Sequence, residues 1–93
     1  MRVLVMTLRL RAPWCQSLKD KRAALRPVLL GLRRRFNVSA AESGLQDAHQ
    51  LMEITLALLV HSAAQGDSLR EQVLQALKQL TEAEVYGEEA EYL

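Results

Sequence analysis

Residues 2–11 read RVLVMTLRLR, and every even position from 4 to 10 in this stretch is leucine or methionine. Apolar side chains that repeat every second residue are typical of a β-strand with one buried face. The same period returns in residues 51–60, LMEITLALLV, where the even positions are again apolar. The two stretches therefore predict two long strands that share one hydrophobic core.

A helix is expected directly after the first strand, over residues 18–35. Ser17 followed by Asp20 has the spacing of a capping box, in which the serine hydroxyl accepts a hydrogen bond from a backbone N–H of the first turn. Apolar residues from Leu18 to Phe36 then repeat along one helical face. Pro27 falls inside this helix, opposite the apolar face, and predicts a kink or a break.

The remaining elements follow from weaker patterns. Residues 36–43 and 83–93 indicate two shorter strands, and a hairpin turn is expected around Gly44. Gly66 is expected to close the strand region, and a second capping box of Ser68 and Glu71 predicts that the second helix opens there.

This order of elements predicts a single ferredoxin-like domain over residues 1–93. Such a βαββαβ chain forms an α+β sandwich, with a four-stranded antiparallel sheet and two helices on one face, because each βαβ crossover is right-handed. The usual strand order is 4-1-3-2. The loops at one end of that fold are expected to bring together Trp14, Cys15, Ser17, Gln46, Asp47 and His49.

Length and composition limit the class of protein. The chain has 93 residues, 49% of them apolar, which suffices for one small core. No apolar run approaches the ~20 residues that span a bilayer, and the N-terminus lacks the pattern of a signal peptide. We therefore expect a cytoplasmic protein that does not bind membranes. The single cysteine, Cys15, excludes a CxxC pair and a cysteine-rich zinc site, and no metal or cofactor is expected.

Charge is divided unevenly along the chain. Residues 1–36 hold ten basic side chains and one acid, a net charge of +9, whereas residues 37–93 hold two basic side chains and ten acids, a net charge of −8. This asymmetry can mark a surface that binds nucleic acid, or it can be neutralised inside the fold or between subunits. The sequence leaves both interpretations open.

Several motifs occur together in a recognisable order. SLKDKR at residues 17–22, RRRFNVS at 33–39, Ala41-Glu42, and Gln46-Asp47 before an apolar strand resemble the YlxP-like family, a small bacterial domain of unknown function. The resemblance covers nearly the whole chain and implies a ferredoxin-like fold. It also implies a loose link to translation, because genes of this family often lie beside those for translation and ribosome-maturation factors. The chain departs from the family pattern at Trp14-Cys15 and at Pro27.

Basic side chains on the first helix are the main candidates for binding. The helix start, with Ser17 beside Lys19 and Arg11, resembles an anion site, unless Ser17 and Asp20 already satisfy its N–H groups. The flank of the same helix resembles a path for a nucleic-acid backbone, unless it is only a solvated surface. The predicted RNA- or anion-binding residues are Arg11, Ser17, Lys19, Lys21, Arg22, Arg26 and Arg33.

Catalytic features are weak. Cys15 beside a helix start and near His49 fits an activated thiolate, but a lone loop cysteine is more often inert, and we predict no catalytic residue. A heavy-metal carrier needs paired cysteines, and an acylphosphatase-like enzyme needs a glycine-bearing loop, whereas the first glycine is Gly31. An RRM-type RNA binder needs aromatic side chains on the central strands, which residues 2–11 and 51–60 lack.

The helix-free face of the predicted sheet is more apolar than a solvated face requires, since it holds Val3, Val5, Thr7, Ala57 and Leu59. Two hypotheses follow. The first is a non-enzymatic module that binds RNA or the ribosome through its basic helix, without DNA specificity. The alternative is a structural or regulatory homodimer that packs through this face and holds a small anion at the helix start. The first requires that the C-terminal glutamates do not cover the basic helix.

Overall fold

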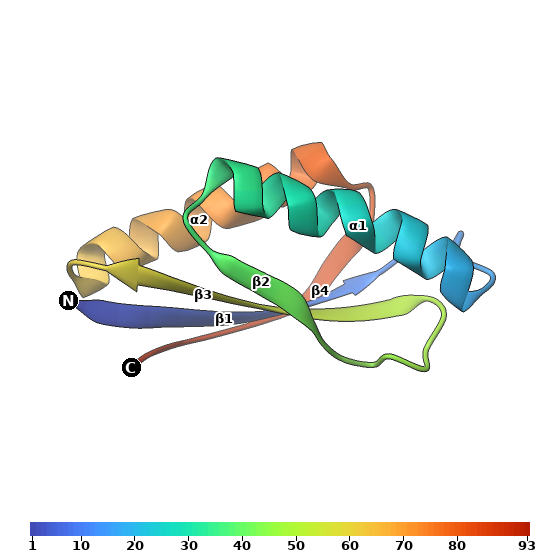
Figure 1. Cartoon of the computed structure of the whole chain (residues 1–93), viewed down its shortest axis with the longest axis horizontal. Coiled ribbons are helices and arrows are strands. Elements are labelled where there is room, and N and C mark those ends of the chain that lie inside the picture. The colour runs from blue at the N-terminus through green and yellow to red at the C-terminus, as the bar shows by residue number, and fades with distance from the viewer.

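The computed structural model describes residues 1–93 and contains four strands and two helices. In chain order these are β1 (Arg2–Arg11), α1 (Leu18–Arg35), β2 (Ser39–Gly44), β3 (Leu51–Val60), α2 (Ala63–Leu80) and β4 (Glu84–Tyr92). The strands form one antiparallel sheet in the order β2-β3-β1-β4. Both helices cover the same face of the sheet, and the other face is bare (Figure 1). The predicted ferredoxin-like α+β fold and its strand order are confirmed.

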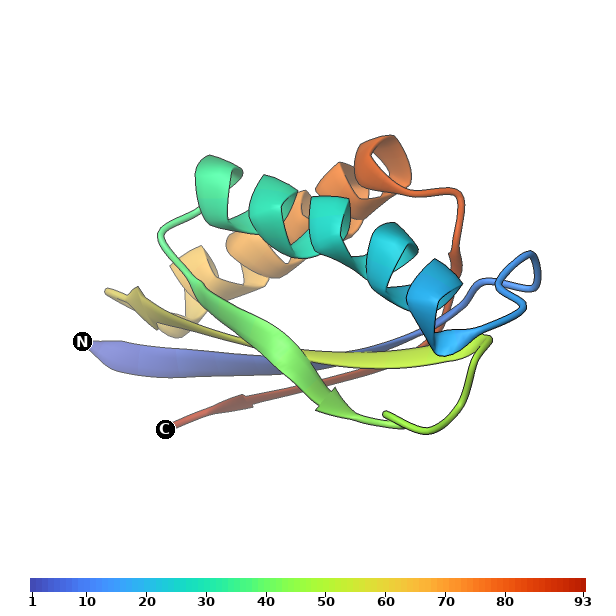
Figure 2. The ribbon, with the colours of Figure 1, turned by 45° about the vertical axis from the view of Figure 1, so that its right-hand side comes forward.

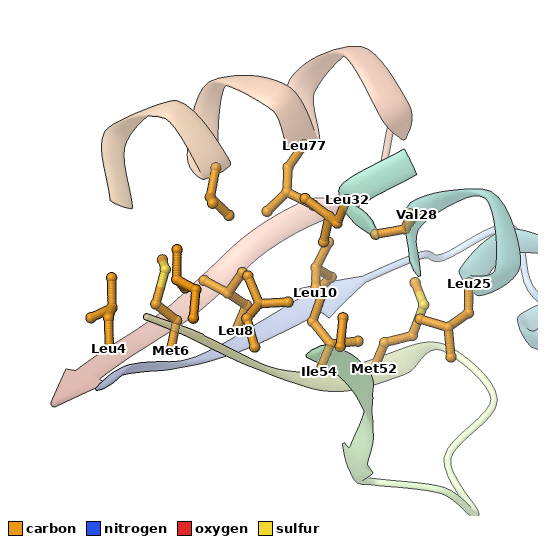
Figure 3. Close-up of a cluster of buried hydrophobic side chains, with 14 of the residues drawn as sticks. Leu4, Met6, Leu8, Leu10, Leu25, Val28, Leu32, Met52, Ile54 and Leu77 are labelled. Carbon is orange, nitrogen blue, oxygen red and sulfur yellow. The ribbon is translucent and has the colours of Figure 1, made fainter. Parts of the chain in front are cut away.

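The core lies between the two helices and the two central strands. The even positions of β1 from Leu4 to Leu10 and of β3 from Met52 to Val60 are buried and face the helices (Figure 3). The helices contribute the buried side chains Leu25, Val28, Leu32, Val73 and Leu77. Each fully buried leucine of this kind stabilises the fold by about 1.5–3 kcal/mol relative to an exposed one.

Helix α1 begins and ends where its sequence predicts. Ser17 is the N-cap, and its Oγ accepts a hydrogen bond from the backbone N–H of Asp20 at 3.1 Å. The helix continues through Pro27, so the predicted break into two pieces does not occur. Pro27 lies on the exposed side, where water can bind the carbonyl of Ala23 that lacks its helical donor.

Helix α2 begins earlier than predicted. Its N-cap is Ser62, whose Oγ accepts from the backbone N–H of Gln65 at 3.2 Å, while Gln65 Oε1 accepts from His61 N at 2.6 Å. The predicted start at Ser68 is therefore wrong by more than one turn. The error arises at Gly66, which is a buried helical residue and not the end of a strand region. A Cβ atom there would lie 2.5 Å from the ring of Tyr92, so any larger residue would force that ring to shift.

The two edge strands are shorter than predicted. Strand β2 begins at Ser39 and not at residue 36, because Phe36 is the C-cap of α1 and donates its N–H to the carbonyl of Leu32. It ends at Gly44, before Leu45, which has a positive φ of 57°. Strand β4 occupies most of the predicted range, and its pairing with β1 contains a bulge opposite Arg9 and Leu10.

Candidate nucleic-acid interface

The exposed face of α1 is strongly basic. Four of its side chains are exposed and make no ion pair or hydrogen bond with the rest of the protein, and we call them the cationic strip: Lys19, Arg22, Arg26 and Arg34. Arg22, Arg26 and Arg34 are separated by multiples of four residues, so they share one row along the helix. At about 1.5 Å of rise per residue, the strip is about 22 Å long.

The C-terminal glutamates do not cover the strip. They lie on or beside β4, at the sheet edge opposite β2, whereas α1 packs beside β2 (Figure 2). They pair with arginines of β1 and α2: Glu84 with Arg11 at 3.2 Å, Glu89 with Arg9 at 3.5 Å, and Glu88 with Arg70 at 2.6 Å. The charge of Glu89 raises the pKa of Arg9, and the hydrogen bond from Arg70 to Glu88 raises the pKa of Arg70.

Lys21 does not belong to the exposed set. Its side chain is buried, with the residue only 2% exposed, and its ammonium donates to the backbone carbonyls of Leu45 at 2.6 Å and Ala48 at 2.9 Å. It also lies 3.0 Å from Oε2 of Glu42. Lys21 therefore fastens the loop between β2 and β3 to the first turn of α1, and its ammonium is not available to an external ligand.

Arg33 and Arg11 are exposed but already have partners. The guanidinium of Arg33 donates to the carbonyl of Ala40 in β2, and Arg11 pairs with Glu84 across the sheet. Both retain their charge near the surface. Their hydrogen bonds hold them to the sheet, so a ligand has to compete for them.

The start of α1 is occupied by its own cap. Ser17 already accepts from the N–H of Asp20, and Oδ2 of Asp20 accepts from the backbone N–H of Gln16 at 2.9 Å. The carboxylate of Asp20 also places a negative charge where an anion would arrive. This arrangement favours the interpretation of Ser17 as a cap over its interpretation as an anion ligand.

Cys15 is part of the core and not of a reactive loop. Its side chain is fully buried, and this burial, followed by the charge of Asp20, raises the pKa of the thiol. Cys15, Asp47 and His49 do line one shallow hollow, and the topology predicts that they lie close together. A protonated, buried thiol is a poor nucleophile, so the hollow lacks an activated cysteine. Trp14, beside it, is 48% exposed.

Arg34 is a member of the strip that was not among the predicted binding residues. The sequence does contain a signal for it, because position 34 continues the spacing of Arg22 and Arg26 past the exposed Leu30. The same spacing identifies Lys21 as a core position, since Leu25, Val28 and Leu32 follow it on the buried face.

The helix-free face of the sheet is divided into two parts. One end is apolar, with Val3, Val5 and Ala57 beside Leu59, which is 62% exposed. The middle is polar, because a chain of hydrogen bonds crosses three strands there. Thr7 Oγ1 lies 3.3 Å from Thr55 Oγ1, Thr55 donates to Ser43 at 2.7 Å, and Ser43 donates to Glu53 at 3.1 Å. Only the apolar end resembles a contact surface.

Neither helix combines the length and the apolarity that crossing a bilayer requires. No group of three or more His, Cys, Asp or Glu side chains gathers in a way that could hold a metal ion.

Comparison with known proteins gives two matches. A family model described as "Protein of unknown function (DUF503)" matches residues 3–90. The chain is also similar to the uncharacterized protein YlxP of Bacillus subtilis (strain 168), with 35% identity over 68 residues, which cover 73% of this chain and 74% of YlxP. Both matches agree with the resemblance based on the motifs of residues 17–47.

Proposed function

The chain belongs to the DUF503 family of proteins of unknown function, and we propose that it is a non-enzymatic cytoplasmic module that binds RNA, free or within the ribosome, through the cationic strip of α1. The observation that carries this proposal is the lack of any protein partner for Lys19, Arg22, Arg26 and Arg34. Eleven acids are present in the chain, yet none of them forms an ion pair with the strip.

The chemistry of the strip fits a phosphate backbone. Lysine and arginine that neutralise phosphates release condensed counterions, which supplies most of the sequence-independent affinity for nucleic acid. Helix α1 carries no aromatic side chain on which a base would stack. We therefore expect the strip to recognise backbone charge and shape, with little preference for base sequence.

The test is a charge reversal of the strip. The triple variant K19E/R22E/R26E should lose binding to RNA and co-sedimentation with ribosomes, with its circular dichroism spectrum unchanged because all three side chains are exposed. A matched pair of single variants controls for net charge. Arg26→Glu and Lys78→Glu each reverse one exposed, unpaired charge on a helix, and only Arg26 lies on the strip. Equal loss of binding in both variants would reject the strip as the site.

A second candidate function is supported by a different observation. The apolar end of the bare sheet face, with Leu59 exposed beside Val3, Val5 and Ala57, fits a surface that packs against a second copy. This proposal expects a dimer that Val5→Arg converts to a monomer, as measured by light scattering. Tyr86→Arg, at an exposed position on β4, is the control that should leave the dimer intact. A monomer at micromolar concentration of the unmodified protein argues against this function.

A further inference from the structure

Strand β4 presents a free backbone edge. The pair Val3 and Leu93 exchanges both backbone hydrogen bonds, at 3.1 and 2.8 Å. Because such pairs alternate along an antiparallel ladder, the backbone groups of Glu91 and Glu89 also face β1. Those of Glu88, Ala90 and Tyr92 face away from the sheet. No other segment of the chain pairs with this side of β4.

The opposite edge of the sheet is protected. Strand β2 has only six residues, and its pairing with β3 is interrupted between Glu42 and Gly44. The carbonyl of Ala40, which the register directs to the free side of β2, accepts the hydrogen bond from Arg33. Short length, irregularity and a covering side chain are the usual means of preventing a strand from joining the edge of a sheet. Strand β4 has a longer uncovered edge.

A groove runs along the free edge of β4 on the helix side. Side chains of α2, among them Glu71, Leu74 and Lys78, form one wall, and Ala83, Val85 and Glu88 form the other. A strand added to β4 would direct every second side chain into this groove. The apolar members Leu74, Ala83 and Val85 would then contact those side chains, as in complexes formed by β-strand addition.

Charge indicates which kind of strand fits. Residues 81–93 contain five glutamates and no basic side chain. Glu71 lines the groove, together with the basic Arg35 and Lys78, and has no ion-pair partner. Glu91 has none either, and its register with Val5 places it on the helix-free face of β4, where Glu89 also lies. Every second side chain of an added strand would lie beside these two glutamates. A second copy that paired β4 with β4 would bring glutamates opposite glutamates, and like charges directly opposite each other destabilise a sheet.

From this combination we propose that the free edge of β4 and the adjoining groove form a docking site for an extended, lysine- or arginine-rich segment of a partner protein. The segment adds an antiparallel strand to the backbone of Glu88, Ala90 and Tyr92. The backbone edge of β4 lies at the side of the sheet opposite β2, and the groove reaches α1 only at Arg35, which is not a member of the cationic strip.

The probe is a fluorescein-labelled nine-residue peptide in which valine and lysine alternate. In the docked strand the valines enter the groove, and a residue whose side chain enters the groove directs its N–H towards β4. N-methylation of the valines should therefore weaken binding at least about tenfold, the loss of more than one net backbone hydrogen bond. N-methylation of the lysines should leave the affinity unchanged. Equal loss with both peptides would overturn the proposal.

Two variants of the protein complete the test. Ala90→Pro removes an N–H that makes no bond to β1, so it should abolish peptide binding without breaking the ladder. E71K/E91K should weaken binding through charge alone, which keeps the test decisive if the proline variant does not fold. Chemical shift changes in the amides of Glu88, Ala90 and Tyr92 are expected on titration. Changes confined to the bare sheet face, or a homodimer that Ala90→Pro converts to a monomer, would overturn the proposal.

Discussion

Lys21 is a buried charged residue that connects a helix to a loop. Its buried ammonium has three oxygen partners, from Leu45, Ala48 and Glu42, and it joins α1 to a loop whose own backbone hydrogen bonds are few. Removing one member of a buried charged network lowers stability, because the remaining polar and charged groups stay buried without a partner. Lys21 therefore holds the loop between β2 and β3 against α1, while Gln50 ties the end of the same loop to Ala12 and Pro13.

The first prediction is a loss of stability in Lys21→Met. Two backbone carbonyls lose their donor and the partly buried carboxylate of Glu42 loses its ion-pair partner, so we expect the free energy of unfolding to fall by about 2–4 kcal/mol. Urea denaturation measures this change. Lys19→Met, an exposed position in the same turn, is the control and should change stability by no more than about 0.5 kcal/mol. Equal effects of the two substitutions would contradict the structural role of Lys21.

A second prediction concerns the reactivity of Cys15. Because the thiol is buried in the core and burial raises its pKa, a thiol reagent at pH 8 should label the native protein only through unfolding. The labelling rate should rise steeply once denaturant unfolds the chain. Rapid stoichiometric labelling of the folded protein would show instead that the cysteine is accessible.

The same thiol predicts how stability depends on pH. The raised pKa means that the unfolded chain loses the thiol proton at a lower pH than the folded protein. Above pH ~9 the unfolded state therefore binds fewer protons, and stability falls as pH rises, by at most about 1.4 kcal/mol per pH unit. Tyr92, whose pKa is raised by its hydrogen bond to Asp67, acts in the same direction at higher pH. Cys15→Ala should remove only the part of the decline that begins near pH 9.

At the scale of the elements, the position of α2 depends on one close contact. Gly66 lies against the ring of Tyr92, whose hydroxyl donates to the carbonyl of Ala63 at 3.1 Å and to Asp67 at 2.6 Å. These bonds keep the ring over the first turns of α2. Strand β4 and helix α2 are therefore in contact at Gly66, which the sequence analysis interpreted as the end of a strand region.

This contact gives a prediction with a change of sign. Gly66→Ala should destabilise the protein by about 1–3 kcal/mol, because the new methyl group overlaps the tyrosine ring. In a Tyr92→Ala background the same substitution should stabilise it by up to about 1 kcal/mol, because alanine is the better helix former. Thermal unfolding of the four proteins measures both effects. Stabilisation by Gly66→Ala in both backgrounds would contradict the packing.

At the scale of the whole molecule, the fold places the most basic segment and the most acidic segment of the chain far apart in space. Helix α1 holds seven basic residues and one acid, a net charge of +6, and residues 81–93 hold five acids, a net charge of −5. These segments lie over opposite edges of the sheet. The molecule therefore has a basic side at α1 and, at the opposite edge, glutamates of which three are paired with Arg9, Arg11 and Arg70. We propose a different class of partner for each of these two sides.

The salt dependence of RNA binding tests the basic side. If the four cations of the strip contact phosphates of a single strand, the slope of log affinity against log salt should be about −3, from about −0.7 for each of four contacts. Each charge removed from the strip should reduce the slope by about 0.7. Lys78→Glu should leave it unchanged. A slope near zero for the unmodified protein would contradict binding through the strip.

Particular residues show how far the sequence predicted this structure. The predicted limits of α1 match the structure because the signal for its start, the cap formed by Ser17 and Asp20, lies within four consecutive residues. The predicted start of α2 was wrong because Gly66 was interpreted as a strand terminator. It is instead a helical residue that packs against Tyr92, 26 positions later in the chain. Arg33 was a candidate ligand, but its hydrogen bond to Ala40 depends on where β2 passes α1. The wrong start of α2 thus arose from a contact between distant residues. A contact of the same kind engages Arg33, whose role in binding stays a prediction.

The sequence by itself determined the order of the elements, the buried faces of β1 and β3, and the family, because hydrophobic period and short motifs are local properties. Only the tertiary structure decided which charges remain free. Ion pairing requires two groups to approach within about 4 Å, and that distance depends on the sheet order and on helix packing. The fold buries Lys21, pairs three of the four glutamates of β4 with arginines of β1 and α2, and leaves the strip on α1 without ion-pair partners.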